Sequence, residues 1–295
     1  MLLKFKKHVY IYSMASTLIA ESGSTKTDWC LLQKGKKPVY FRTSGINPYL
    51  QGADEIKAQL KKELPDDKAI FKADSIAYYG AGAGSKLKKQ ELKQTLQSIF
   101  KIKDVDVQTD LLAAARSLCN DKKGIVCILG TGSNSGFYNG SKIAVQKPSL
   151  GYIAGDEGSG NHMGKRVLQY YAYNTFDSEL RMVFEQYYGN DISQLVNKLY
   201  TEPFPNRYLA QFVKMLIDNR GHFMVENIIE DCLSDFFQQH ILKYRQSYNY
   251  PLYFTGAVAF GFKDIIESLC SQYELKVGKI AQNPIEGLLL YHKSK

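Results

Sequence analysis

The chain has 295 residues, of which 44% are hydrophobic and 23% are charged, so it can bury a sizeable core and is not expected to be disordered. This length exceeds what one small core needs and suits two lobes. The net charge of +9 comes from lysines and arginines that form no basic block interleaved with aromatic residues, which argues against nucleic acid as a partner.

The first twenty residues combine a basic start with a moderately apolar run and faintly resemble a signal peptide. Tyr10 and Tyr12 interrupt that run, and cleavage after Ala20 would remove a strand that the next motif needs. The segment is also too short and too polar to span a bilayer, so no membrane partner is expected. We expect residues 1–13 to be an extension that precedes the fold, with translation able to begin at Met14.

Two segments far apart in the chain, residues 17–41 and 124–146, share one pattern. Each has a short buried strand, a turn of Gly, Ser and Thr residues, a second strand, a turn with glycine and a third strand. The separation is much longer than the period of a solenoid. The repeat therefore predicts two similar lobes that face each other.

Helical and strand patterns alternate through the rest of the chain, which predicts an α/β protein. The predicted elements are helices at about 51–64, 86–99 and 225–244, strands at 251–256 and 275–281, and a closing helix that begins at Pro284. His240 lies on the apolar face of the third helix and is expected to be a packed core residue.

The five cysteines are far apart, and neither a C-x-x-C motif nor a Cys/His cluster with zinc spacing is present. Most of them lie inside apolar runs. We interpret them as reduced core residues of a cytoplasmic protein.

Two glycine-rich turns occupy equivalent places in the repeat, the first at Gly23–Lys26 and the second at Gly130–Ser133. Successive backbone N–H groups in such turns form an anion-binding nest, and hydroxyl and lysine side chains add donors for phosphate oxygens. A plain hairpin explains one such turn equally well, but two turns in equivalent places of a repeat are a much more specific signal. Glu21, which ends the strand before the first turn, is a candidate Mg²⁺ ligand or an exposed edge charge. Neither a P-loop nor a Rossmann glycine motif in its proper setting is present.

Acidic residues stand at the start of two later helices. Asp110 lies between a predicted strand and a predicted helix, where it could cap the helix or act as a general base at a cleft wall. Asp156 and Glu157 stand in a glycine-rich loop ahead of another helix. Capping explains one of these two acids, but it does not explain the glycines around them.

The motifs ESGSTKT, SGINP, QTDLLAAA, LGTGSN, GDEGSG and FTGAVA occur in this order from about residue 18 onward. Together they resemble the N-acetylglucosamine kinases and their relatives, the ATPase activators of 2-hydroxyacyl-CoA dehydratases, within the actin-like and sugar kinase ATPase superfamily. The resemblance implies a two-lobed actin-like (ribonuclease H-like) α/β fold with a nucleotide cleft between the lobes. The N-terminal lobe would comprise residues 1–115 joined by the C-terminal helix 284–295, and the C-terminal lobe would comprise residues 116–283.

The resemblance also implies roles for single residues. Asp110 would be the catalytic base. Glu21 would bind Mg²⁺, at a position where the superfamily most often has Asp. The implied ATP-binding residues are Gly23, Ser24, Thr25, Lys26, Gly130, Thr131, Gly132, Ser133, Gly256 and Ala257. The implied sugar-binding residues are Asn47, Asp110, Ser149, Leu150, Gly151 and Asp156.

The implied activity is ATP- and Mg²⁺-dependent phosphorylation of an amino sugar, with N-acetylglucosamine and its 6-hydroxyl favoured. An ATPase switch of the dehydratase-activator type is an alternative, although no cysteine motif suits the iron–sulfur cluster that those activators require. A non-catalytic sensor, and a kinase for N-acetylmuramic acid or glucosamine, also stay open. The sequence leaves the oligomeric state open, a homodimer included.

Overall fold

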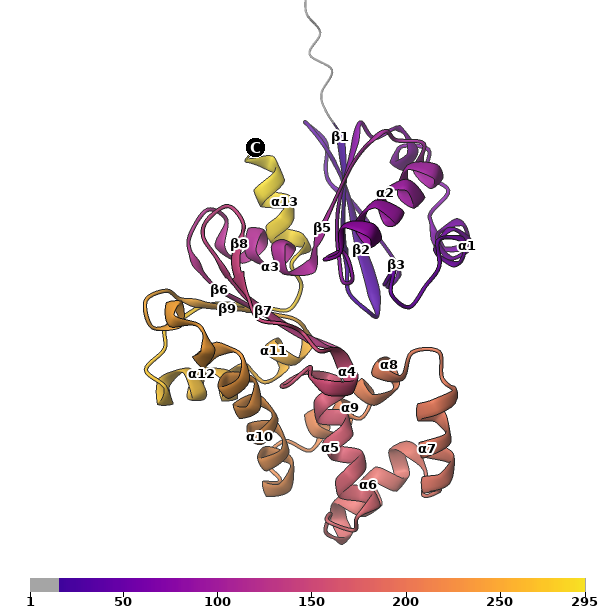
Figure 1. Ribbon diagram of the computed structural model, residues 1–295. Coiled ribbons are helices and arrows are strands. Elements are labelled where there is room, and N and C mark those ends of the chain that lie inside the picture. Colours follow the sequence, from indigo (N-terminus) through magenta and orange to yellow (C-terminus); the bar gives the residue numbers. More distant parts are fainter. Residues whose placement is uncertain (1–15, 295) are drawn as a thin grey trace, which may run out of the picture.

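Two five-stranded sheets, one in each lobe, organise the computed structural model, which describes residues 16–294 (Figure 1). The expectations for residues 1–13 and Met14 lie outside these described residues. The strands of the first sheet are β1 (Ser16–Ser22), β2 (Lys26–Gln33), β3 (Val39–Ser44), β4 (Ser75–Gly80) and β5 (Asp104–Thr109). The strands of the second sheet are β6 (Gly124–Leu129), β7 (Ser133–Tyr138), β8 (Ile143–Gln146), β9 (Leu252–Thr255) and β10 (Val277–Ala281).

The two sheets have the same topology. Their strand orders are β3-β2-β1-β4-β5 and β8-β7-β6-β9-β10. In each sheet the central strand pairs antiparallel with the strand that follows it in the chain and parallel with a later strand. The repeat and the α/β class predicted from the sequence are therefore confirmed.

Amphipathic helices cover the outer face of the first sheet. They are α1 (Ala53–Glu63) and α2 (Lys86–Phe100), with the short 3₁₀ helix η1 (Ile70–Lys72) before β4. Leu92, Leu96 and Phe100 of α2 are spaced by four residues and join the buried cluster around Trp29. Ser85 caps α2 by accepting a hydrogen bond from the Lys88 N–H.

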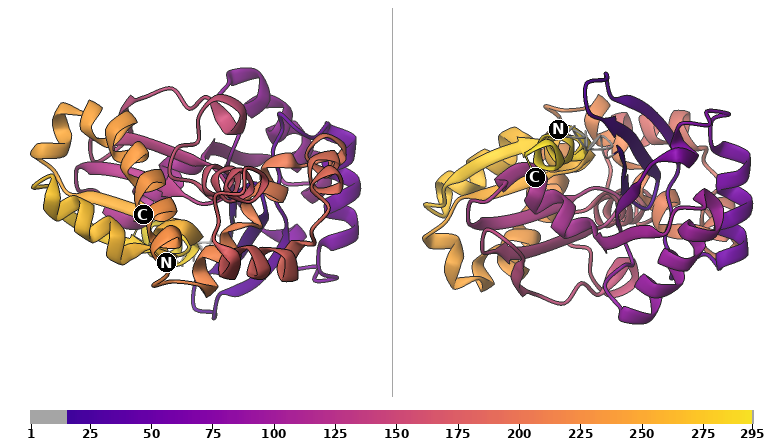
Figure 2. Two further views of the ribbon diagram at one scale, coloured as in Figure 1. Left: turned by 90° about the horizontal axis from the view of Figure 1, so that it is seen from below. Right: turned by 90° about the horizontal axis from the view of Figure 1, so that it is seen from above.

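The second lobe carries a long helical region. Its helices are α4 (Gly151–Ala154), α5 (Gly160–Ala172), α6 (Ser178–Tyr188), α7 (Ile192–Thr201), α8 (Pro205–Ala210), α9 (Val213–Asp218), α10 (Phe223–Gln239), η2 (Ile241–Lys243), η3 (Arg245–Tyr248), α11 (Ala257–Gly261) and α12 (Lys263–Gln272). In Figure 1, α7 and α8 lie below the first lobe, and the view from below in Figure 2 places them under the same lobe.

The helix α10 ends earlier than the apolar pattern predicts, because the chain tightens into η2 after His240. His240 is buried at 7% exposure, which confirms the prediction of a core position. The His240 ring also makes polar contacts, however. Its Nε2 atom lies 3.0 Å from Glu157 Oε2, and its Nδ1 atom lies 3.4 Å from Ser135 Oγ.

The helix α3 (Asp110–Cys119) lies between the two sheets. Its Ala113 belongs to a buried cluster on the first sheet, while Ala114 and Ala115 belong to a cluster on the second. The helix α13 (Ile285–Lys293) packs against α3, β1 and β2. At their crossing, Gly287 lies so close to Ser117 that a side chain at position 287 would overlap its hydroxyl.

All five cysteines are buried, as the sequence predicts for core residues. Within residues 16–294, no helix is long and apolar enough to cross a membrane.

Candidate functional site

The first glycine-rich turn connects β1 and β2 at the end of the first sheet. The Gly23 N–H donates to the Lys26 carbonyl at 3.0 Å, which closes the turn. The N–H groups of Ser24 and Thr25 have no hydrogen-bond partner among the described residues. The backbone of Gly45 lies against Gly23 and Ser24 with no room for a side chain, and its N–H donates to the Thr25 carbonyl at 3.0 Å. The motif SGINP therefore packs directly against this turn and supports it.

The second turn connects β6 and β7 and is one residue tighter than the first. The Gly130 N–H donates to the Gly132 carbonyl at 3.0 Å, and the N–H groups of Thr131 and Gly132 are left without a partner among residues 16–294. The hydroxyl of Ser133 is buried, and it too has no partner in the described part of the chain. Each turn thus presents two successive free N–H groups, which is the arrangement of an anion-binding nest.

The two turns meet. Thr25 Oγ1 and Thr131 Oγ1 lie 3.0 Å apart, so a hydrogen bond joins residues from the two lobes. Gly256, with a φ of +115°, lies directly against the Leu129 carbonyl and leaves no room for a Cβ atom. Ala257 begins the helix α11 immediately afterwards. The structure thus brings both predicted phosphate turns and the predicted adenosine motif to one place.

The Lys26 ammonium already has two side-chain partners. It lies 2.7 Å from Asn283 Oδ1 and 2.8 Å from Asp28 Oδ2. Asn283 precedes α13, and nothing in the sequence pattern marks it as a partner of Lys26. Lys26 therefore connects the first turn to the closing segment of the chain.

Carboxyl groups with raised pKa values gather beside the turns. Burial, with the charges of Asp110 and then Asp28, raises the pKa of Glu21 from its usual 4.5 to about 8. Burial also raises the pKa of Asp110, and the nearby charge of Asp156 adds to this shift. Carboxyls that are shielded from water and repel one another in this way are typical of functional sites.

A divalent cation fits this group of acids, because it would offset the repulsion that raises the pKa of Glu21. Among the described residues, no set of three or more His, Cys, Asp or Glu side chains could hold a metal. Mg²⁺ commonly needs only one or two protein carboxylates, with phosphates and water completing its shell. Glu21 is placed to be one of them.

Asp110 is the first residue of α3, but it is not the residue that caps the helix. Thr109 is the N-cap, and its Oγ1 accepts a hydrogen bond from the Leu112 N–H at 3.2 Å. The Asp110 carboxylate accepts the N–H of Leu111, at 2.7 Å. Thr109, and not Asp110, is therefore the cap of this helix, so capping does not explain the acid at position 110.

Asp156 lies under the second turn. Its carboxylate accepts hydrogen bonds from the Ser133 N–H at 3.3 Å and from Asn161 Nδ2 at 2.7 Å. A Cβ atom at Gly132 would lie 2.9 Å from Asp156 Oδ2, so this carboxylate packs directly against the turn. The backbone of Asp156 has a φ of +61°, which costs free energy for a residue other than glycine.

Asn161 is a site residue that the sequence reasoning missed. Besides its bond to Asp156, its Nδ2 donates to the Thr131 carbonyl at 2.7 Å, and its N–H donates to the same oxygen at 3.0 Å. Its position directly after GDEGSG was the available signal.

The remaining predicted sugar-binding residues lie on both lobes. The Ser149 hydroxyl donates to the Ser133 carbonyl at 3.4 Å, so the segment Ser149–Gly151 lies beside the second turn. Leu150 is 64% exposed there. Asn47 lies on the first lobe, where its Oδ1 accepts the Tyr49 N–H at 3.0 Å. No hydrogen bond joins Asn47 to the second lobe among the described residues.

Comparison with solved structures supports an actin-like ATPase fold. A proposed N-acetylglucosamine kinase from Porphyromonas gingivalis is 37% identical, with a TM-score of 0.89 over 95% of this chain and 99% of that one. A proposed N-acetylglucosamine kinase from Chromobacterium violaceum is 17% identical, with a TM-score of 0.68 over 94% and 99%. MreB5 of Spiroplasma citri, bound to AMPPNP, is 12% identical, with a TM-score of 0.55 over 95% and 96%. The last two show likeness of fold alone.

No protein-family model and no curated protein matches the chain. The two-lobed actin-like fold predicted from the motifs is nevertheless confirmed by the solved structures.

Proposed function

The chain belongs to the N-acetylglucosamine kinase-like family of the actin-like ATPase superfamily, and from this premise we propose that it is an ATP-dependent kinase that phosphorylates N-acetylglucosamine at the 6-hydroxyl. The observation that carries the proposal is the contact between the two equivalent turns. Through Thr25 and Thr131 these turns hold two pairs of free N–H groups together beside acids with raised pKa values.

In this proposal the two turns bind the phosphates of ATP. The free N–H groups of Ser24, Thr25, Thr131 and Gly132 supply donors, and the buried Ser133 hydroxyl supplies another. Gly256 and Ala257 would let the adenosine approach the backbone. Glu21 would hold Mg²⁺, directly or through water, and the metal would supply positive charge to the phosphates.

Asp110 is the proposed general base. As the sugar O6 atom bonds to the γ-phosphorus and the bond to the leaving ADP oxygen breaks, the Asp110 carboxylate accepts the hydroxyl proton. The products are ADP and the sugar 6-phosphate. A carboxylate with a raised pKa suits this role, because a stronger base accepts the proton more readily. Positioning of the reacting groups and neutralisation of charge would supply most of the rate.

The sugar would lie between Asn47 on the first lobe and Ser149–Gly151 on the second. Both Asp156 oxygens already accept hydrogen bonds, so any contact of Asp156 with a sugar hydroxyl would be shared with the second turn. Sugar binding and the phosphate turn would thus be linked through one carboxylate.

We also propose that the moving units are residues 1–115 with helix 284–295, and residues 116–283. Packing of α13 on α3, β1 and β2 supports the assignment of that helix to the first unit. Closure of the units would exclude water and limit wasteful hydrolysis of ATP.

An ADP-release assay over a panel of sugars tests the proposal. We expect ADP release with N-acetylglucosamine, with slower turnover of glucosamine and of N-acetylmuramic acid, and a 6-phosphate product by NMR. Greater turnover of N-acetylmuramic acid would overturn the choice of sugar. ATP hydrolysis that no sugar stimulates would favour an ATPase switch, and nucleotide binding without turnover would favour a sensor.

A further inference from the structure

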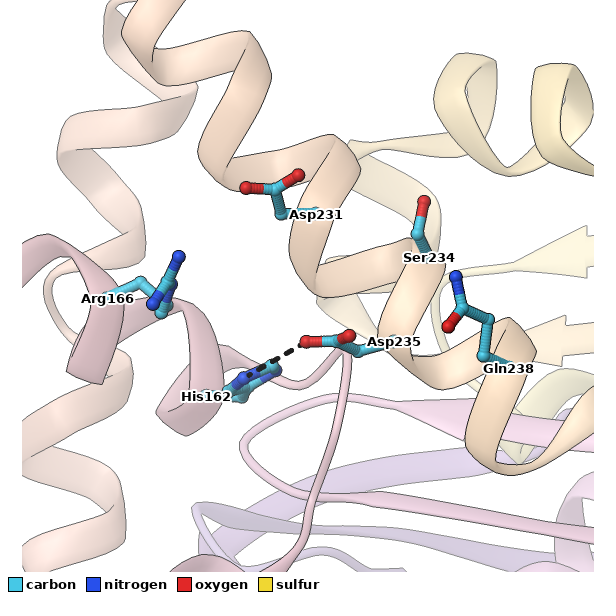
Figure 3. Close-up of a pocket in the computed structure, with 6 residues that line it drawn as sticks. All are labelled: His162, Arg166, Asp231, Ser234, Asp235 and Gln238. Carbon is cyan, nitrogen blue, oxygen red and sulfur yellow. Dashed lines mark ion pairs between the residues drawn. The ribbon is translucent and has the colours of Figure 1, made fainter.

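A polar pocket of about 300 Å³ lies between the helices α5 and α10, apart from the proposed active site. In Figure 3 the side chains of His162, Arg166, Asp231 and Asp235 point toward the space between the two helices. The lining residues are His162 and Arg166 of α5 and Asp231, Ser234, Asp235 and Gln238 of α10. None of these six residues has a role in the proposed kinase reaction.

The charges of Arg166 and Asp231 are not paired within this pocket. Arg166 faces Asp231 and Asp235 across the pocket (Figure 3). Among the described residues, neither the Arg166 side chain nor the Asp231 side chain has a hydrogen bond or an ion pair, although Arg166 lies over the Tyr170 ring at 5.7 Å. Asp231 and Asp235 are one helical turn apart, where like charges repel and destabilise a helix.

His162 joins the pocket to the loop that carries Asp156. Its Nδ1 atom accepts the Gly158 N–H at 3.1 Å, so the ring hydrogen lies on Nε2. That Nε2 atom is directed toward the pocket and lies 3.8 Å from Asp235 Oδ2, too far for a hydrogen bond (Figure 3). His162 therefore has one nitrogen bound to the loop and one free donor toward the pocket.

The loop beyond Gly158 has little freedom to absorb a shift of the His162 ring. Gly158 has a φ of +70°, and a Cβ atom there would lie 2.7 Å from Phe236 Cβ of α10. Two residues earlier in the chain, the Asp156 carboxylate holds the Ser133 N–H and packs against Gly132. A movement of His162 would thus reach the second phosphate turn through its bond to Gly158, the chain from Gly158 to Asp156, and the contacts of Asp156 with the turn.

We propose that this pocket is a second binding site for a small zwitterion of the amino-acid class, and that its occupant alters nucleotide affinity through His162. The ligand carboxylate would bind Arg166 and the His162 Nε2–H, and the ammonium group would lie between Asp231 and Asp235. Ser234 and Gln238 offer hydrogen bonds to a polar side chain. A volume of about 300 Å³ suits a molecule of this size.

The binding test uses the full chain and a panel of glycine, L-serine, L-glutamine, L-glutamate and L-lysine, followed by calorimetry and thermal shift. We expect at least one member to bind with a Kd below about 10 mM. Its N-acetyl and α-carboxamide derivatives, which each lack one charge, should bind at least about tenfold more weakly. Arg166→Gln and Asp231→Asn should weaken binding similarly. Glu230→Gln, an exposed substitution on α10 outside the pocket, is the matched control.

The coupling test measures ATP binding by calorimetry with and without the amino acid, which needs no turnover and is independent of the kinase proposal. We expect the Kd for ATP to change by about fivefold or more. In His162→Asn the amide oxygen can still accept the Gly158 N–H but the Nε2 atom is lost, so this change should disappear. Absence of binding by the whole panel, or binding unaffected by both pocket substitutions, overturns the site. An unchanged Kd for ATP in the bound wild-type protein overturns the coupling.

Discussion

Thr25 Oγ1 and Thr131 Oγ1 lie 3.0 Å apart although 106 residues separate them in the chain. Each threonine lies in one of two glycine-rich turns, and each turn follows the central strand of its own sheet. This contact joins the lobes where their free N–H groups are concentrated, so the two turns can act on one chain of phosphates.

The hydroxyl of Thr25 is expected to matter for nucleotide binding. Thr25→Val should raise the KM for ATP by about 3- to 10-fold, the worth of one hydrogen bond. Thr25→Ser keeps the hydroxyl and is the matched control. Steady-state kinetics with ATP as the varied substrate checks the difference, and equal KM values for the two variants would contradict a role for the hydroxyl.

Asp110→Asn should abolish proton acceptance while the fold is kept. Because Thr109 already caps α3, we expect a melting temperature within a few degrees of wild type and normal ATP binding. The kcat should fall by about 10²- to 10⁴-fold. Thr109→Ala is the converse control, which should cost about 1 kcal/mol of stability and leave kcat within a few-fold. Retention of more than about a tenth of kcat in Asp110→Asn would rule out the base assignment.

Gly256→Ala should damage the nucleotide site. The new Cβ atom would overlap the Leu129 carbonyl, and a φ of +115° is strained for any residue other than glycine. We expect ATP affinity to fall at least about tenfold, together with a lower melting temperature. Gly261→Ala places a methyl group in open space at the end of α11 and should be nearly silent in both measurements.

Glu21→Gln should lower activity and raise stability at the same time. The carboxylate has a folded pKa of about 8 against a usual value of 4.5, so its ionisation costs folding free energy as the pH rises between these values. Glutamine carries no such cost, so its advantage in melting temperature should grow from pH 5 to pH 8 in the absence of Mg²⁺. The same variant should need more Mg²⁺ for half-maximal activity. An unchanged Mg²⁺ requirement would remove Glu21 from the metal site.

His292 is expected to make the fold sensitive to acid. Burial and the neighbouring Arg116 charge lower its pKa from 6.5 to about 4, while its Nε2 atom lies 2.9 Å from the Tyr79 hydroxyl. Between about pH 6.5 and pH 4, His292 is therefore protonated in the unfolded chain and neutral in the folded chain. The stability that is present above pH 6.5 is lost as the pH falls toward 4. His292→Gln can keep a hydrogen bond to Tyr79 but cannot titrate. Its melting temperature should fall less than that of wild type between pH 7.5 and pH 5.

The sequence predicted those parts of the fold and site that depend on local chemistry. The repeat, most strands and the two turns follow from apolar patterns and from glycine, which few other residues can replace at such positions. Contacts between distant segments were not accessible in this way. The bond between Lys26 and Asn283 depends on how α13 returns to the first lobe, and no local pattern encodes that path.

Orientation was also beyond the sequence. The GDEGSG motif identifies Asp156 as a candidate site residue, but only the fold shows that its carboxylate faces Gly132 and Ser133. Likewise, an acid at a helix start predicted either a cap or a base at Asp110. The choice of Thr109 as the cap depends on where β5 ends, which sequence patterns locate only to within a few residues.

The return of α13 to the first lobe has a consequence for synthesis of the chain. Ile285, Leu288 and Leu289 of α13 pack with Ala113 of α3 over one face of the first sheet, against Ile19 and Ala77. A chain emerging from the ribosome would therefore leave part of this apolar face uncovered until α13 has been made. The lobe that is translated first would therefore be among the last parts to finish folding, and chaperones could bind its exposed apolar face until then.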